Sequence, residues 1–126
     1  MLFERATQKS LEDIDRDLRE SAARNKFGVL GVHDLKEAME KKGVSFANTC
    51  LVYEVCNPEQ AKHVLEANGA FSTVLPCRIS VYGSENNYKI ATVLPTALVA
   101  LFEGKDLEPV AREVEQVLIT MIEDTV

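Results

Sequence analysis

Apolar and polar positions follow one another along the chain in blocks that predict short strands and amphipathic helices. Residues Leu2 to Ala6 are expected to form a first strand. Ser10 has the character of a helix N-cap. The apolar residues after it recur at the three- and four-residue spacing of a helix, at Leu11, Ile14, Leu18 and Ala22. This pattern predicts an amphipathic helix of about four turns.

A second strand and a short helix follow in the same way. The apolar run from Phe27 to Val32 predicts the strand. Asp34 is the expected N-cap of the helix, and Gly43 marks its end. The inner side of this helix carries Leu35, Ala38 and Met39.

The third strand leads into a strong helix-start signal. Residues Cys50 to Cys56 are rich in β-forming side chains, and the run stops at Asn57-Pro58. Asn at the cap, Pro at the first helical position and Gln60 three residues past the cap are typical of a helix N-terminus. We expect this helix to end at Gly69.

Regular alternation from Phe71 to Tyr82 predicts a fourth strand. Pro76 within it favours an edge position or a bulge, because proline has no amide proton to donate to a central ladder. The segment from Gly83 to Asn87 has turn composition, so Tyr88 to Leu94 is expected to return as a hairpin partner.

Two helices are expected at the end of the chain. Pro95 opens a short helix that stops at Gly104, and the last helix begins near Asp106. The last helix carries an apolar stripe made of Val110, Val114, Val117, Leu118 and Met121.

The elements follow one another in the order β-α-β-α-β-α-β-β-α-α. This order predicts one α+β domain over residues 1–126: a single curved, mostly antiparallel sheet with its helices packed mainly on one face. The first three strand–helix units leave room for some parallel pairing.

One face of such a sheet would stay open. In the register we expect, it carries Arg78 and Ser80 on one strand and an apolar group on another, made of Leu51, Tyr53 and Val55. Because apolar side chains of this size need cover, we expect a homodimer that buries them through the sheet. The alternative is that a helix of the same chain covers them.

Composition and charge narrow the function classes. The chain has 126 residues, 46% hydrophobic and 27% charged, which is typical of a domain that folds without disulfides or metal. Acidic residues outnumber basic ones by 20 to 14, so nucleic-acid binding is not expected. No segment has the roughly 18 consecutive apolar residues of a membrane helix, and the start lacks a signal-peptide pattern. Three cysteines in such a chain predict reduced thiols in the cytoplasm.

Cys56 and Cys77 are the candidate catalytic residues. Cys56 directly precedes a helix N-terminus, which would stabilise a thiolate and lower its pKa. Cys77 follows Pro76 on the apolar face of its strand. If the two strands are neighbours, the thiols lie at one end of the sheet, where they can oxidise or hold a soft metal. Either cysteine can equally be a packed core residue.

Other residues offer less chemistry. Cys50 lies six residues before Cys56, roughly 20 Å along a strand, and cannot share its site. His33 and His63 are expected at the surface, so we expect no zinc centre within one chain, although a dimer could assemble one. We expect no cofactor. Glu54, on the Cys56 face of the strand, is either a general base beside the thiol or a solvated carboxylate.

Four segments in order resemble domain-of-unknown-function family 302: Phe27-Gly28-Val29-Leu30, Lys42-Gly43-Val44 with Phe46, Cys56-Asn57-Pro58 and Leu75-Pro76-Cys77. The similarity runs from about Phe27 to Glu115. It implies a prokaryotic α+β domain similar in topology to the TATA-binding-protein-like group, with no established activity. The residues carried over are the two cysteines, with Asn57, Pro58 and Pro76 as candidate ligand-binding residues.

Three functions remain open at this point. The first is a thiol-centred site at Cys56 and Cys77, for redox, sulfur or soft-metal chemistry. The second is a non-catalytic module that binds an unidentified small molecule in an apolar cavity between the sheet and the last helix. The third is a structural homodimer whose cysteines only pack. The sequence does not decide whether the protein is an enzyme.

Overall fold

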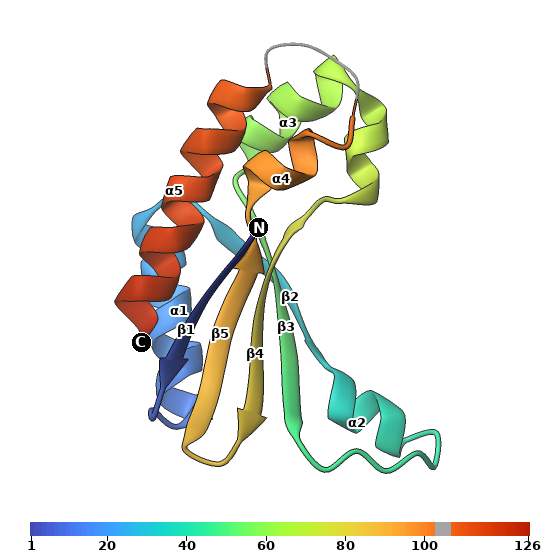
Figure 1. The fold of residues 1–126 in the computed structure, drawn as a ribbon, viewed down its shortest axis with the longest axis vertical. Coiled ribbons are helices and arrows are strands. Elements are labelled where there is room, and N and C mark those ends of the chain that lie inside the picture. Colours follow the sequence, from blue (N-terminus) through green and yellow to red (C-terminus); the bar gives the residue numbers. More distant parts are fainter. Residues whose placement is uncertain (103–106) are drawn as a thin grey trace.

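The computed structural model describes residues 1–102 and 107–126 and shows helices layered on one five-stranded sheet (Figure 1). The strands are β1 (Leu2–Thr7), β2 (Gly28–Asp34), β3 (Thr49–Cys56), β4 (Cys77–Ser84) and β5 (Asn87–Val93). The helices are α1 (Leu11–Arg24), α2 (Leu35–Glu40), α3 (Pro58–Ala67), α4 (Pro95–Val99) and α5 (Glu108–Thr125), with a 3-10 helix at Gly69–Thr73. The predicted α+β class and element order are confirmed.

All neighbouring strands in the sheet are antiparallel, in the order β1-β5-β4-β3-β2. The expectation of some parallel pairing is therefore wrong. Strands β1 and β2, which α1 connects, do run in the same direction. They lie at opposite edges with three strands between them, so no ladder forms between them.

The first three helices begin at the predicted caps. In each, the side-chain oxygen of the cap accepts a hydrogen bond from the backbone amide three residues later: Ser10 from Asp13 at 3.2 Å, Asp34 from Glu37 at 2.9 Å, and Asn57 from Gln60 at 3.2 Å. Pro58 takes the first helical position of α3, as expected.

The predicted strand from Phe71 to Tyr82 is wrong in its first half, because Gly69–Thr73 forms the 3-10 helix. The side chain of Asn68 caps this helix by accepting from the amide of Ala70 at 2.9 Å. Phe71 is buried, and its ring lies 4.3 Å from that of Phe102, centroid to centroid. Since β4 begins at Cys77, Pro76 precedes the ladder rather than interrupting it.

The short helix near the end of the chain begins where predicted and is shorter than predicted. Pro95 opens α4, which ends at Val99, before the predicted stop at Gly104. Helix α5 begins at Glu108. Gly104 itself and the predicted helix start at Asp106 lie outside the described residues.

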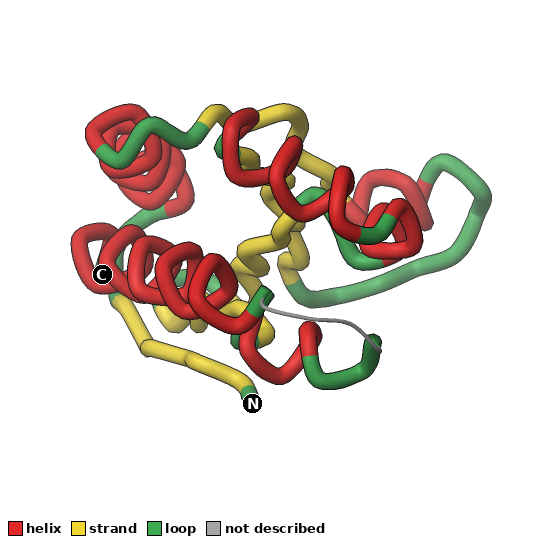
Figure 2. The backbone as a smooth tube through the Cα atoms, turned by 90° about the horizontal axis from the view of Figure 1, so that it is seen from above, coloured by secondary structure: helices red, strands yellow, loops and turns green. Residues whose placement is uncertain are grey.

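Helices α1 and α5 lie side by side and cover one face of the sheet (Figure 2). Their apolar stripes are buried with the inward-facing residues of the strands, among them Ile14, Leu18, Leu118, Met121 and Ile122. The hydroxyl of Tyr53, in the middle of β3, donates a 2.7 Å hydrogen bond to Asp15 of α1. Strand β3 and the helix layer are therefore joined by a polar contact as well as by apolar packing.

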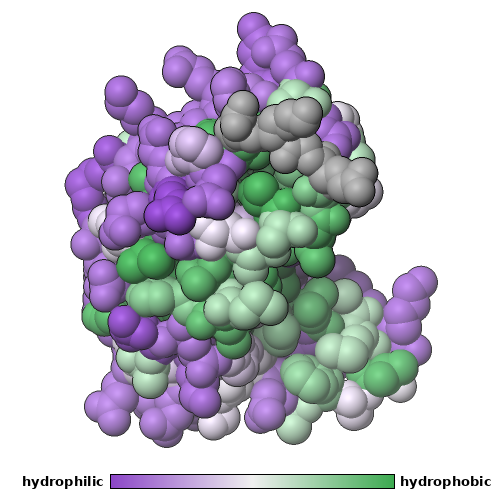
Figure 3. Space-filling view, turned by 45° about the horizontal axis from the view of Figure 1, so that its top comes forward, coloured by the Kyte–Doolittle hydropathy of each residue, from purple (hydrophilic) through white to green (hydrophobic). Residues whose placement is uncertain are grey.

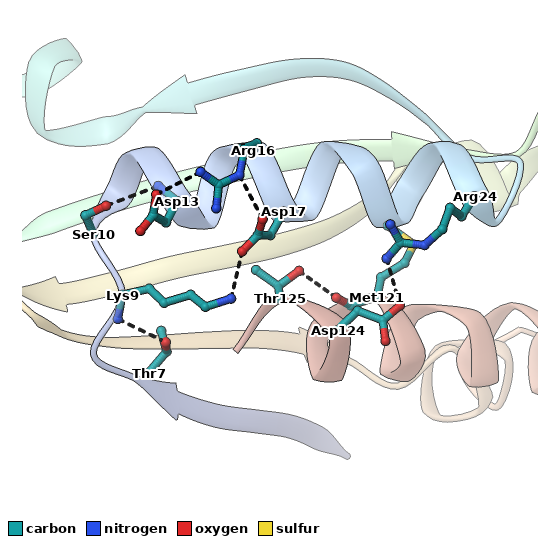
Figure 4. Close-up of polar contacts among 10 residues, drawn as sticks. All are labelled: Thr7, Lys9, Ser10, Asp13, Arg16, Asp17, Arg24, Met121, Asp124 and Thr125. Carbon is teal, nitrogen blue, oxygen red and sulfur yellow. Dashed lines mark hydrogen bonds and ion pairs between the residues drawn. The ribbon is translucent and has the colours of Figure 1, made fainter.

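Polar contacts join α1 to the segment before it and to α5 (Figure 4). Lys9 reaches Asp17 of α1 at 2.7 Å, and the carboxylate of Asp17 also accepts from Arg16 at 3.0 Å. The hydrogen bonds from Lys9 and Arg16 lower the pKa of Asp17. Between the two helices, Asp124 accepts from Ser21 at 2.9 Å and from Arg24 at 3.3 Å.

The register corrects the argument for a homodimer. Tyr53 lies opposite Ile79 and Val55 opposite Cys77, so these side chains share the helix-covered face and not the face of Arg78 and Ser80. Tyr53 is 1% exposed and Val55 0%. Helices of the same chain cover them, which was the alternative. The homodimer stays a prediction, and the exposed apolar face from which it was argued does not exist.

Hydrophobic side chains also reach the surface near α2. In Figure 3 they extend from the middle of the visible face onto the projecting segment around this helix. Leu35, Val44 and Phe46 are the large exposed side chains of this segment. Among residues 1–102 and 107–126, none of the helices combines the length and apolar character needed to cross a bilayer.

Candidate functional site

The end of β3 and the start of β4 bring two of the three cysteines to one place. Val55 lies directly opposite Cys77, and Cys56 is the next residue along β3. The prediction that Cys56 and Cys77 occupy neighbouring strands at one end of the sheet is confirmed. Cys50 lies opposite Tyr82, toward the other end of the same strands, as expected.

A cavity opens at this end of the sheet, and both cysteines line it. Its wall comes from the ends of β3 and β4 together with α3, the 3-10 helix, α4 and α5. The apolar part of the wall includes Val64, Phe71, Leu98, Val110 and Val114. The volume of the cavity that the centre of a water molecule can occupy is about 70 Å³. The cavity thus lies at the ends of β3 and β4 with α5 on one side, whereas the second hypothesis placed it between the sheet and the last helix.

Burial keeps both thiols protonated. It raises the pKa of Cys56 above its usual value of 9.0, so the predicted lowering of this pKa is wrong. Removing a thiolate from water disfavours the charged form, which is the cause of the raised pKa of Cys56. Burial, with a smaller contribution from the neighbouring Cys56, raises the pKa of Cys77 to about 11. Neither thiol is a thiolate nucleophile at neutral pH.

Asn57 and Gln60 supply the remaining polar groups of the wall. Asn57 is occupied as the cap of α3 through its side-chain oxygen. Gln60 donates from its side-chain Nε2 to Glu113 of α5 at 3.2 Å. Its side-chain Oε1 is buried and has no hydrogen-bond partner within the described part of the chain. An unpaired buried acceptor costs free energy, so this atom requires an explanation.

The other candidate ligand-binding residues lie around the cavity rather than in its wall. Pro58 is exposed at the start of α3. Pro76 lines a second hollow of about 160 Å³, next to the cavity. Four residues belong to the walls of both spaces: Val74, Cys77, Pro95 and Leu98. Cys77 is therefore part of the partition between them.

The remaining titratable candidates have other partners or lie in solvent. Glu54, two residues before Cys56 on β3, pairs with His33, their Oε1 and Nε2 atoms being 3.0 Å apart. His63 is exposed on α3, as predicted. Among the described residues, no group of three or more His, Cys, Asp or Glu side chains is placed to hold a metal ion.

A family model described as "Domain of unknown function DUF302" matches residues 3–125. The chain belongs to the DUF302 family. The matched range is longer than the segment of sequence resemblance, and it includes β1 and nearly all of α5. No curated protein matches the chain.

A solved structure supports this assignment. The crystal structure of an uncharacterized conserved DUF302 protein from Bacillus stearothermophilus is 28% identical in sequence and superposes with a TM-score of 0.92. The similarity covers 99% of this chain and 98% of that one. The DUF302 fold thus extends over the whole length described here, whereas the similarity to TATA-binding-protein-like topology stays a prediction.

Sequence reasoning found the two thiols and missed most of the wall around them. Gln60 was recognised only as part of a helix-start signal, and Phe71 was assigned to a strand. Both residues line the cavity because α3 and the 3-10 helix fold back over the ends of β3 and β4. The sequence does contain one indication of this wall. The segment from Ala61 to Leu75 is more apolar than a connection exposed to solvent would be, which indicates that part of it is buried.

Proposed function

We propose that this DUF302 chain is a small-molecule-binding domain whose cavity takes a small, mainly apolar ligand against the thiols of Cys56 and Cys77. One observation carries the proposal. The cavity has an apolar wall with a few convergent polar groups, which is the usual composition of a ligand site.

The size of the cavity supports a ligand of a few non-hydrogen atoms. About 70 Å³ is open to the centre of a water-sized sphere. A single water needs only about 10–15 Å³ by the same measure, and apolar cavities of larger size stay dry and take up benzene or xenon. Water molecules in this space would find few hydrogen-bond partners in its wall, so an apolar guest is favoured.

The protonation state of the thiols supports binding rather than nucleophilic catalysis. With raised pKa values, both cysteines are neutral at pH 7. A neutral thiol is a soft and weakly polar surface, suited to an apolar guest. Nucleophilic attack would need the thiolate.

Xenon is the direct probe. We expect xenon to cause saturable chemical-shift changes in the amide and methyl NMR signals of Val64, Phe71 and Val114, and not in those of the open sheet face. An Ala61→Leu variant places a larger side chain in the wall and should abolish the changes. Ala67→Leu makes the same change at an exposed position of the same helix and should leave them intact. Absence of saturable changes in the wild-type protein would refute the proposal.

A second candidate, thiol oxidation, is favoured by the position of Cys56 and Cys77 on neighbouring strands. With hydrogen peroxide as oxidant, one thiol loses its proton and its sulfur attacks the peroxide. The proton leaves with the released hydroxide, so the products are a sulfenic acid and water. The second thiol then displaces water from that sulfur and forms the disulfide. Two thiols and one peroxide thus give one disulfide and two waters.

Mass spectrometry of the full chain tests this candidate. Limiting peroxide should remove two hydrogens from the wild-type chain and from a Cys50→Ser variant. The Cys56→Ser variant should stop at single-thiol products. If Cys50→Ser blocks the loss as effectively as Cys56→Ser does, the pairing is different and this candidate fails.

A further inference from the structure

We infer that Gln60 selects the ligand, and that the ligand class is a small apolar molecule carrying one hydrogen-bond donor, an O–H or an N–H group. The inference rests on the proposed function, since it names the chemistry of the guest in the same cavity. The donor of the guest would pair with the side-chain Oε1 of Gln60.

Two contacts fix Gln60 in place. Its backbone amide donates to the side-chain oxygen of Asn57 at 3.2 Å, which holds it in the first turn of α3. Its side-chain Nε2 donates to Oε1 of Glu113 at 3.2 Å, which ties the side chain to α5. The backbone of Gln60 and its side-chain amide are thus each held by a hydrogen bond, so the side-chain amide is preorganised.

The partner of the amide decides which way it faces. A carboxylate at neutral pH only accepts hydrogen bonds, so the group of Gln60 nearest Glu113 must be the NH₂. The exposed contact to Glu113 consequently turns the carbonyl oxygen away from it. That oxygen is buried and has no partner among the described residues, in a residue that lines the cavity.

The remaining polar groups of the wall cannot satisfy this oxygen as well as a guest can. The side-chain oxygen of Asn57 is itself an acceptor and is used as a cap. The thiols of Cys56 and Cys77 are weak donors. A guest with an O–H or N–H group supplies the missing donor, whereas a purely apolar guest leaves the acceptor unpaired.

Pyrrole and furan test this inference, because the two rings have nearly the same size and only pyrrole has an N–H donor. Each is titrated into the full chain and followed by the NMR shifts of the cavity residues. We expect the wild-type protein to bind pyrrole about tenfold more tightly than furan, the gain from pairing a buried acceptor.

Variants assign the preference to Gln60. Gln60→Leu removes the acceptor at nearly constant size and should reduce the affinity ratio of pyrrole to furan to about one. Gln60→Met is a second variant without the acceptor, in case the branched side chain disturbs folding. Gln116→Leu makes the same change at an exposed position of α5 and should keep the wild-type ratio.

The outcomes separate this inference from the proposed function. Equal affinities for pyrrole and furan in the wild-type protein overturn the inference and leave the small-molecule cavity standing. The same holds if Gln60→Leu and Gln60→Met keep the wild-type ratio. Absence of saturable binding by both rings and by xenon overturns the inference and the proposed function together.

Discussion

Val55 lies directly opposite Cys77 in the ladder between β3 and β4, and Val55 is completely buried. Cys77 therefore continues the inner face of the sheet to the point where the cavity begins. The side chain packs against the buried core and also lines the cavity. This double role explains why the pKa of Cys77 is raised more clearly than that of Cys56.

The first prediction concerns thiol reactivity. In chains that retain a single cysteine, iodoacetamide labelling of Cys77 should show a midpoint well above that of a free thiol, because burial, the larger cause of its raised pKa, remains when Cys56 is removed. Labelling of Cys56 should have a midpoint above that of a free thiol. Free cysteine in the same series is the control, and circular dichroism at each pH verifies that the chain is folded. A Cys77 midpoint below that of free cysteine would contradict the structure.

The second prediction concerns stability at alkaline pH. The folded pKa of Cys77 is raised above its usual 9.0, so the thiol contributes its full stability below pH 9. As the pH rises from about 9 to about 11, the unfolded chain loses this proton and the folded chain keeps it. One pKa unit corresponds to about 1.4 kcal/mol, so the loss is on the order of 2–3 kcal/mol by pH 11.

Urea unfolding of the wild-type chain and of a Cys77→Ala variant measures this loss. The free energy of unfolding of the wild type should fall more steeply between pH 8 and pH 11, by roughly the amount given by the pKa shift. Other groups contribute to both profiles. Tyr53, whose pKa is raised by burial and by its hydrogen bond to Asp15, is common to both chains and cancels. Parallel pH profiles would show that Cys77 is not the group responsible.

The third prediction concerns the cap of α3. Asn57→Ala removes the hydrogen bond to the amide of Gln60 and should lower the free energy of unfolding by about 1 kcal/mol. Asn48→Ala makes the same change at an exposed position outside the helices and should have almost no effect. Chemical denaturation of the two variants side by side decides whether the cap stabilises the fold.

The fourth prediction concerns the hairpin between β4 and β5. Gly83 has a φ of +134°, and a Cβ built there would lie 2.4 Å from the backbone oxygen of Asn87. Gly83→Ala should therefore destabilise the chain by roughly 1–3 kcal/mol. Gly69→Ala is the control, since no atom lies within 4 Å of a Cβ at that position. A Gly83→Ala variant as stable as Gly69→Ala would mean that the turn relaxes without cost.

The features that were predictable from the sequence are local ones. The three caps at Ser10, Asp34 and Asn57 depend on hydrogen bonds that span three residues, so the sequence contains both partners. The hairpin follows from turn composition between two apolar runs, and its Ser84–Asn87 pairing is as tight as that composition suggests. The two cysteines were placed correctly because strand ends adjoin strand starts in an antiparallel pair.

The features that were missed depend on contacts between distant segments. The alternation beginning at Phe71 suits a strand, but the cap at Asn68 and the packing of Phe71 on Phe102 favour a 3-10 helix. The face to which Tyr53 points depends on the register with Ile79, and a shift by one residue reverses it. The unpaired oxygen of Gln60 follows from the position of Glu113 on another helix.

The ladder between β1 and β5 joins the first strand of the chain to the last one. Strands β2, β3, β4 and β5 pair in the order in which a ribosome makes them, each beside its predecessor. Strand β1 leaves the ribosome first and finds its partner only after β5 has been synthesised, so its pairing closes the longest loop in the sheet. The pairing of β1 thus completes the sheet at the edge of β5, which would otherwise present unpaired backbone groups.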